Sequence, residues 1–250
     1  MSNDSRYAVR SVLRVLDIFD LLRQRPGGAT LAELTKVTDL PKSSMFRYLS
    51  TLESRAYVER EDETGIYRLG AAFLVNEARH FELLGRVARP RLERLRDEFQ
   101  ETVNLGVLDA TRIVYLEIVE SRRSMRFVAE RGHREHVHST ALGKAICTEL
   151  EDSEILTILE SEGMPALTDK TITDPELFVK TVDGIRHDGY AIDDGENEPA
   201  GRCVAVPIAG VSPRAAISLS APAARFSIED AREAASALAR VAAEISAELS

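Results

Sequence analysis

The sequence has few cysteines and no long apolar run, and each absence excludes a class of protein. Its 250 residues include only two cysteines, Cys147 and Cys203, which are too few for a disulfide framework. The longest nearly apolar run, residues 204–211, contains a proline and a glycine and is far shorter than the roughly 20 residues of a membrane-spanning helix. Residues 1–20 carry charges throughout, so no secretory signal is visible. We therefore expect a reduced protein of the cytoplasm with no membrane partner.

The composition is that of a folded globular chain whose charge is unevenly distributed. Hydrophobic residues make up 44% and charged residues 29% of the sequence, which excludes a disordered or collagen-like chain. The net charge is −9, yet residues 1–90 hold 14 basic against 12 acidic residues, so the acidic excess lies in residues 91–250. This asymmetry predicts two modules with different partners. An acidic chain can still bind nucleic acid, because the contacts depend on a local patch.

The start of the chain predicts three helices in close succession. The first covers residues 11–22 and ends at a run that contains a proline and two glycines. Thr30, with Glu33 three residues later, is typical of a capping box and places the start of the second helix at Thr30. After a tight turn at residues 38–40, Pro41 suits the first position of a third helix, where its missing N–H costs nothing.

Two short strands follow the third helix. Residues 57–60 and 66–69 are separated by a turn that contains a glycine, and together they predict a hairpin. The helix pair at residues 30–49, followed by a hairpin at residues 57–69, has the order of a winged helix-turn-helix. The first helix is expected to pack behind this pair.

The third helix predicts a surface for duplex DNA. Met45, Leu49 and Leu52 cluster on one side of a helical wheel, which leaves the opposite side polar. An arginine there can take a bidentate contact to guanine, and the helix N-terminus can hold a phosphate. The candidate DNA-contacting residues are Lys42, Ser43, Ser44, Phe46, Arg47 and Ser50 and, in the wing, Arg60 and Arg68. The alternative is a three-helix cap with a solvated face, but the capping box, turn length, proline and wing together favour DNA binding.

The remaining chain predicts an α+β domain, in which helices cover an antiparallel sheet. Strands are expected at residues 103–108, 113–119, 125–129, 202–209 and 215–220, and helices at residues 140–150, 153–161, 175–187 and 228–249. Between the two modules, Gly85 and Pro90 predict a break in a helical region. We therefore expect a DNA-binding domain at residues 8–70, a linker helix at residues 71–85 and an effector-binding and oligomerisation domain at residues 86–250.

Six short motifs follow one another along nearly the whole chain. They are RSVLRVLD at 10–17, LPKSS at 40–44, YRLG at 67–70, HSTALGKA at 138–145, GYAIDD at 189–194 and ISLS at 217–220. In this order and spacing they resemble the IclR family of bacterial transcription regulators. The resemblance implies a winged helix-turn-helix followed by a GAF-like domain that binds a small effector, often an organic or aromatic acid.

The resemblance also implies which residues hold the effector. Carried over by motif, they are Ala141, Leu142, Asp193, Cys203, Ser218 and Ser220. The two serines lie two residues apart on a predicted strand, so both hydroxyls point to one face. Met125 and Phe127, together with Leu142, are expected to line the apolar part, since small-ligand pockets combine an apolar wall with a few polar groups.

One position departs from the family pattern. The family usually has glycine two residues before the pair Arg202-Cys203, and this chain has Ala200 there. The loop over the pocket is therefore expected to differ in shape, and the identity of the effector does not transfer. Without the resemblance, Ser218 and Ser220 would be expected to pair with strand neighbours, and Asp193 to cap a turn.

Catalytic or metal chemistry has weaker support. His133, His136 and His138 are close in sequence, but no cysteine or acidic residue has typical zinc spacing around them, so we expect surface histidines. Cys203 with His187 would be the nucleophile and base of an enzyme, the alternative function, yet neither lies in a catalytic motif. We therefore expect no catalytic residue, no metal and no cofactor.

These observations predict an effector-responsive transcription regulator. The expected partners are double-stranded operator DNA, a small effector that is a carboxylate, and further copies of the chain as a homodimer or a dimer of dimers. Because a dimer supplies two half-sites, the operator should be near-palindromic. Repression is the more usual direction in the family, although the sequence does not choose between repression and activation. A sensor that never contacts DNA is a further alternative, which salt-dependent binding to promoter fragments would distinguish.

Overall fold

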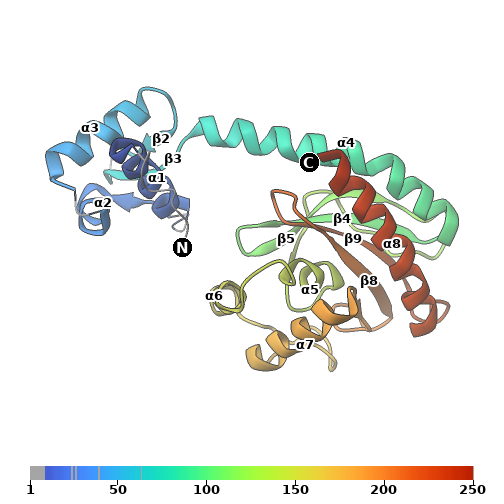
Figure 1. Ribbon diagram of the computed structural model, residues 1–250. Helices are drawn as coiled ribbons and strands as arrows, with labels where there is room; N and C mark the ends of the chain where they lie inside the picture. Colours follow the sequence, from blue (N-terminus) through green and yellow to red (C-terminus); the bar gives the residue numbers. More distant parts are fainter. Residues whose placement is uncertain (1–8, 24, 26, 39, 63, 250) are drawn as a thin grey trace. The chain divides into compact units, whose positions relative to one another are not determined.

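The chain divides into two compact units, residues 1–79 and residues 80–250 (Figure 1). The computed structural model describes residues 9–23, 25, 27–38, 40–62 and 64–249. The predicted α+β class is confirmed, with a helix-turn-helix in the first unit and an antiparallel sheet covered by helices in the second. Among the described helices, none has the length and apolar character needed to cross a membrane.

The first unit combines short helices with a small antiparallel sheet. Its elements are α1 (Arg10–Arg23), β1 (Ala29–Thr30), α2 (Leu31–Thr38), α3 (Lys42–Glu53), β2 (Val58–Arg60) and β3 (Ile66–Leu69). The sheet order is β1-β3-β2, so the predicted hairpin gains a strand from the residues just before α2. The predicted capping box is present. The Thr30 backbone N–H donates to Glu33 Oε2 at 2.8 Å, and the Glu33 N–H donates to Thr30 Oγ1 at 3.4 Å.

Apolar side chains from α1, α2 and α3 form the core of the first unit. Ile18, Leu34, Met45 and Leu49 are fully buried. Each fully buried side chain of this size contributes about 1.5–3 kcal/mol relative to an exposed one. The predicted stripe of α3 therefore points inward, which leaves its opposite face available at the surface.

The second unit is built on one antiparallel sheet of order β6-β5-β4-β9-β8-β7. Its strands are β4 (Thr102–Asp109), β5 (Arg112–Val119), β6 (Arg134–His136), β7 (Ala191–Asp193), β8 (Gly201–Ile208) and β9 (Ala215–Pro222). Its helices are α5 (Ala141–Cys147), α6 (Asp152–Glu162), α7 (Pro175–Asp188) and α8 (Ile228–Leu249), together with the second part of α4 (Ala71–Phe99).

The predicted strand at residues 125–129 is wrong, because residues 121–130 form an irregular loop. Side chains satisfy the backbone of this loop in place of a neighbouring strand. Arg225 Nη2 donates to the Met125 carbonyl at 2.8 Å, and Thr102 Oγ1 donates to the Phe127 carbonyl at 3.1 Å. The short strands β6 and β7, which sequence patterns did not predict, form the two edges of the sheet.

Helix α4 is continuous, which corrects the predicted break near Gly85 and Pro90. Gly85 serves close packing, since a Cβ at this residue would lie 3.2 Å from Glu117 Oε1 on β5. Pro90 removes one helical hydrogen bond. The apolar residues on either side of it, among them Val87 and Leu92, are buried against the sheet, and this packing overrides the local preference for a break.

Side chains of the sheet alternate between two faces. On β4, Val103, Leu105 and Val107 belong to the core shared with α4 and α8. Asn104 pairs directly with Ser218 of β9, so both side chains lie on the opposite face, the one that α5 covers. Figure 1 shows α8 and α5 on opposite sides of the sheet. Asn104 and Ser218 therefore place polar groups on the α5 face.

Candidate functional site

The outer face of α3 is polar and free of contacts within the described chain. Lys42, Ser43, Phe46, Arg47 and Ser50 are exposed, with Phe46 at 51%. Ser44 is half-buried. No side chain of the described residues forms a hydrogen bond or ion pair with the charged groups of Lys42 and Arg47. Pro41 precedes the helix without a side-chain cap. The Ser44 N–H donates to the Pro41 carbonyl at 2.9 Å, which leaves the N–H groups of Lys42 and Ser43 available to an anion.

The two predicted wing arginines differ in their surroundings. Arg60 is exposed, and its guanidinium lies 5.9 Å from the centre of the Tyr67 ring. Arg68 is half-buried; its Nε donates to the Gly27 carbonyl at 3.3 Å, and its Nη2 lies 3.5 Å from Glu61 Oε2. Arg60 is therefore the arginine of the wing whose charge is free to meet a phosphate, because Glu61 already faces Arg68.

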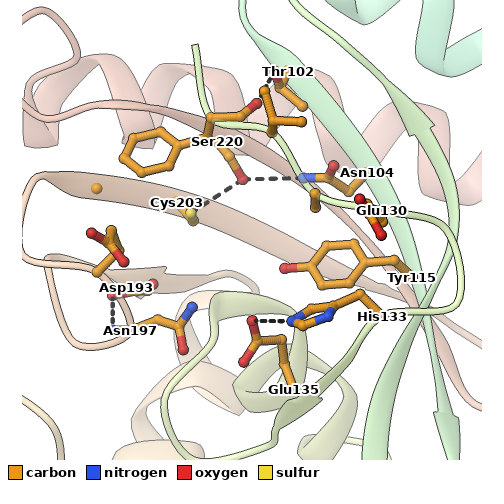
Figure 2. Close-up of a pocket in the computed structure, with 15 residues that line it drawn as sticks. Thr102, Asn104, Tyr115, Glu130, His133, Glu135, Asp193, Asn197, Cys203 and Ser220 are labelled. Carbon is orange, nitrogen blue, oxygen red and sulfur yellow. Dashed lines mark hydrogen bonds and ion pairs between the residues drawn. The ribbon is translucent and has the colours of Figure 1, made fainter. Parts of the chain in front are cut away.

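The second unit contains a polar cavity of about 390 Å³ on the α5 face of the sheet (Figure 2). Small-ligand pockets have volumes of this order. The lining comes from all six strands of the sheet, β4 to β9, and from the loops after β5 and β7. It comprises Thr102, Asn104, Tyr115, Phe127, Val128, Ala129, Glu130, His133, Glu135, Asp193, Asn197, Glu198, Gly201, Cys203 and Ser220.

A hydrogen-bonded group joins three strands on one wall of the cavity. Asn104 Nδ2 donates to Ser220 Oγ at 3.1 Å and to Ser218 Oγ at 3.2 Å. Cys203 Sγ donates to the same Ser220 oxygen at 3.1 Å, and Figure 2 shows this chain of contacts along the wall. Burial raises the pKa of the Cys203 thiol to about 12, so the sulfur stays protonated and is a poor nucleophile.

Asp193 lies at the end of β7, where it is the register partner of Cys203 on β8. Its side chain is buried, and Oδ1 accepts hydrogen bonds from the backbone N–H groups of Glu196 at 2.7 Å and Asn197 at 3.3 Å. Burial raises the pKa of Asp193 to about 6, although these hydrogen bonds and the charge of Lys144 oppose the rise. The loop after β7 is therefore folded around a carboxyl group whose pKa is higher than that of an exposed aspartate.

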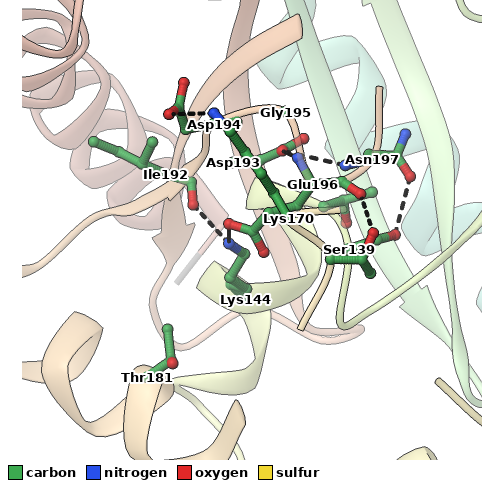
Figure 3. Close-up of polar contacts among 12 residues, drawn as sticks. Ser139, Lys144, Lys170, Thr181, Ile192, Asp193, Asp194, Gly195, Glu196 and Asn197 are labelled. Carbon is green, nitrogen blue, oxygen red and sulfur yellow. Dashed lines mark hydrogen bonds and ion pairs between the residues drawn. The ribbon is translucent and has the colours of Figure 1, made fainter. Parts of the chain in front are cut away.

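A buried lysine holds the same loop from behind (Figure 3). Lys144 of α5 is 1% exposed; its Nζ donates to the Ile192 carbonyl at 2.7 Å and forms an ion pair with Glu196. Ser139 Oγ donates to Asn197 Oδ1 at 3.0 Å, which fixes the next residue of the loop. The positive charge of Lys144 is thus neutralised outside the cavity, whose lining does not include this lysine.

Comparison with known families decides the assignment. The family described as "IclR helix-turn-helix domain" matches residues 11–62, and the one described as "Bacterial transcriptional regulator IclR C-terminal" matches residues 78–247. The chain belongs to the IclR family. The family predicted from the sequence motifs is therefore confirmed, and with it the role of a DNA-binding transcriptional regulator.

Individual IclR-family proteins match nearly the whole chain. The HTH-type transcriptional regulator KdgR of Escherichia coli K12 is 34% identical over 97% of this chain and 93% of its own length. The transcriptional repressor IclR of the same organism is 30% identical over 95% of this chain and 89% of its own. These relatives are transcription regulators and not enzymes.

Solved IclR-family structures share the fold. IclR of Thermotoga maritima superposes with a TM-score of 0.63 at 29% identity and covers 96% of this chain and 98% of its own. An IclR homologue of Microbacterium hydrocarbonoxydans, complexed with 4-hydroxybenzoate, has a TM-score of 0.61 at 24% identity, covering 95% of this chain and 98% of its own. The second match, at this identity, speaks for the fold alone.

The cavity is lined by half of the candidate effector residues that were predicted from the sequence. Those that line the cavity are Phe127, Asp193, Cys203 and Ser220. Those outside the lining are Met125, Ala141, Leu142 and Ser218. Ala141 and Leu142 belong to the first turn of α5 and are buried in the core between this helix and the sheet, and Met125 is 70% exposed on the loop after β5. Ser218 is 2% exposed and lies behind Asn104, to which its hydroxyl is bonded.

Several lining residues were missed by sequence reasoning. Thr102 and Asn104 alternate with apolar residues on β4, and Tyr115 lies between apolar neighbours on β5. This alternation is the signal that could have located them, because polar residues inside an otherwise apolar strand mark a face that is not core. The loop residues Glu130 and Asn197 carry no comparable signal.

The nearby histidines do not form a metal site. His138 is fully buried and its Nε2 lies 3.1 Å from the Pro165 carbonyl, which corrects the prediction of a surface residue. His136 is half-buried, while His133 is exposed and contacts Glu135 at 3.1 Å. Within the described part of the chain, no three His, Cys, Asp or Glu side chains are grouped to hold a metal ion.

Proposed function

We propose that this IclR-family regulator is a repressor whose affinity for operator DNA changes when a small organic or aromatic acid binds in the cavity of the second unit. The observation that carries the DNA-binding part is the face of α3, where Lys42, Arg47 and two serines are exposed without a partner in the described chain. Side chains with unused donors on a helix supported from behind suit entry into the major groove. The name of the E. coli repressor relative supports the direction of control.

The division of labour follows the two units. We assign DNA contact to residues 8–70, connection to residues 71–85 within α4, and effector binding and oligomerisation to residues 86–250. The regulator acts in the cytoplasm, as a homodimer or a dimer of dimers, on a near-palindromic operator. One chain presents a single α3, whereas a two-fold assembly presents a pair that reads two half-sites.

Effector binding and operator binding are thermodynamically coupled. A ligand shifts operator affinity only through its different affinities for the DNA-competent and DNA-incompetent states, and couplings of this kind are about 1–3 kcal/mol. A protein of the same fold is complexed with 4-hydroxybenzoate, a small aromatic acid. Phe127 and Val128 provide an apolar wall for an aromatic or aliphatic part of such a ligand.

Substitution of Arg47 tests the DNA-binding face. We expect Arg47→Ala to weaken binding to a duplex selected by the wild-type protein from a random pool by at least tenfold in a gel shift. Thermal unfolding should stay nearly unchanged, because the side chain is exposed and unpaired. Arg240→Ala on α8 is the matched control, since it removes the same charge from an exposed position of the second unit. Equal operator affinity for Arg47→Ala and wild type would contradict the assigned face.

A further inference from the structure

The lining of the cavity is rich in hydrogen-bond acceptors and poor in positive charge. Four carboxylates line it: Glu130, Glu135, Asp193 and Glu198. Among the described residues that line the cavity, there is no lysine and no arginine, and the sole imidazole, His133, already contacts Glu135 at 3.1 Å. Such a lining accepts hydrogen bonds from a ligand that donates them.

The acceptors are spread around the cavity. Glu130 belongs to the loop after β5, Glu135 to β6, and Asp193 to β7. No three acidic, histidine or cysteine side chains of the described chain converge to hold a single cation. Separate acceptors match a molecule that carries several donors along its length, which a single ammonium group does not.

Several groups in the cavity have unused hydrogen-bonding capacity, among them Asn104 Oδ1, which is buried and has no hydrogen-bond partner within the described chain. The Tyr115 hydroxyl forms no hydrogen bond with any described residue, and Figure 2 shows it directed into the space between Cys203, Asp193 and Glu135. Asp193 uses only Oδ1 for the loop backbone, so Oδ2 has no donor within the described chain. A hydroxyl group both donates and accepts, so a ligand hydroxyl can serve the phenol and the carboxylate together.

We propose that the cavity binds a polyhydroxylated small molecule, a sugar or a hydroxylated acid, and that its hydroxyl groups carry the recognition. Tyr115 and Asp193 bind these hydroxyls, and Phe127 covers the carbon chain. This inference rests on the proposed function, because it takes the cavity as the effector site. The volume of about 390 Å³ suits a compound of small size rather than an oligosaccharide.

Matched ligands test the proposal on the full-length protein by isothermal titration calorimetry. The probes are sorbitol, erythritol, glycerate and gluconate, with propionate and hexanoate as hydroxyl-free acids of equal carbon number, and putrescine as a cation. We expect at least one hydroxylated compound to bind at least tenfold more tightly than its hydroxyl-free counterpart. The affinities for sorbitol and for gluconate then show whether the cavity prefers a neutral polyol or an acid. Equal or tighter binding of hexanoate, a preference for putrescine, or no binding by any hydroxylated probe would overturn the proposal.

A tyrosine pair tests the residue assignment. Tyr115→Phe removes one hydroxyl that has no partner in the described chain, so folding should persist, and affinity for the best hydroxylated probe should fall roughly three- to tenfold. Tyr190→Phe, outside the cavity lining, should leave that affinity unchanged. Unchanged affinity in Tyr115→Phe would overturn this role.

A gel shift on the same preparation separates the two hypotheses. Intact operator binding without binding of hydroxylated probes rejects the ligand class alone. Binding of these probes without any DNA binding rejects the proposed regulator and leaves the ligand class standing.

Discussion

Asp193 should destabilise the folded protein at neutral pH, and Asp193→Asn should remove that cost. The carboxyl group is buried, and its pKa is raised to about 6 against an ordinary value of about 3.9 in the unfolded chain. Two pKa units correspond to about 3 kcal/mol between the charged and neutral forms. Asparagine keeps an oxygen for the backbone N–H groups of Glu196 and Asn197, so the substitution removes the charge and little else.

The sign of the pH dependence follows from the direction of the shift. Because the folded state binds the Asp193 proton more tightly than the unfolded state, the cost is fully present above pH 6 and disappears as the pH falls toward 4. We expect Asp193→Asn to be more stable than wild type by about 3 kcal/mol at pH 7.5 and by about 1.5 kcal/mol at pH 5. For the second unit, this gain at pH 7.5 corresponds to a melting temperature roughly 5–10 °C higher.

The neighbouring aspartate supplies the control. The pKa of Asp194 is lowered by its hydrogen bonds to Lys170 and Arg202, so its charge stabilises the fold. Asp194→Asn should therefore be destabilising at both pH values. Urea unfolding of both variants and wild type at pH 7.5 and pH 5 measures these differences. A neutral or destabilising Asp193→Asn at pH 7.5, or a gain of equal size at both pH values, would refute the burial argument.

Two further predictions concern α5 and its contacts. Gly143→Ala should prevent folding of the second unit, because a Cβ at this residue would lie 2.2 Å from the Val137 carbonyl oxygen. Gly184→Ala is the control: a Cβ there has nothing within 4 Å, and the substitution should stabilise the fold by about 0.5–1 kcal/mol. Thermal melts followed by circular dichroism compare the two variants with wild type. Lys144→Met should cost about 3–5 kcal/mol in urea unfolding, because it leaves Glu196 half-buried without its partner. The double variant Lys144→Met/Glu196→Gln should recover part of the loss, and a double variant no more stable than the single one would contradict the pairing.

The helix-turn-helix was predictable because its signals are local. The Thr30–Glu33 capping box, Pro41 and the apolar stripe of α3 all lie within a few residues of the elements they define, and the structure places those elements as expected. Strand β1 was missed because its partner, β3, lies more than thirty residues away in the sequence. Two-residue strands have no periodicity for a sequence pattern to report.

The cavity was only partly predictable, because distant strands build it. Asn104 and Ser220 are bonded across a separation of 116 residues, a pairing that no local pattern fixes. The family motifs correctly indicated that Asp193, Cys203 and Ser220 line the cavity, whereas Leu142, named on the same basis, is buried in the core. The unbroken α4 illustrates the same limit, since burial against the sheet outweighed the helix-breaking character of its proline.

The alternation along β4 gives successive residues of one strand two different surroundings. Residues 103, 105 and 107 maintain the apolar core, while Thr102 and Asn104 face the cavity. Substitutions at 102 and 104 therefore change the cavity wall at small cost to folding, provided that the hydrogen bonds of Thr102 to the loop after β5 and of Asn104 to β9 are replaced. Alternate residues of a single strand thus shape the cavity separately from the core that supports it.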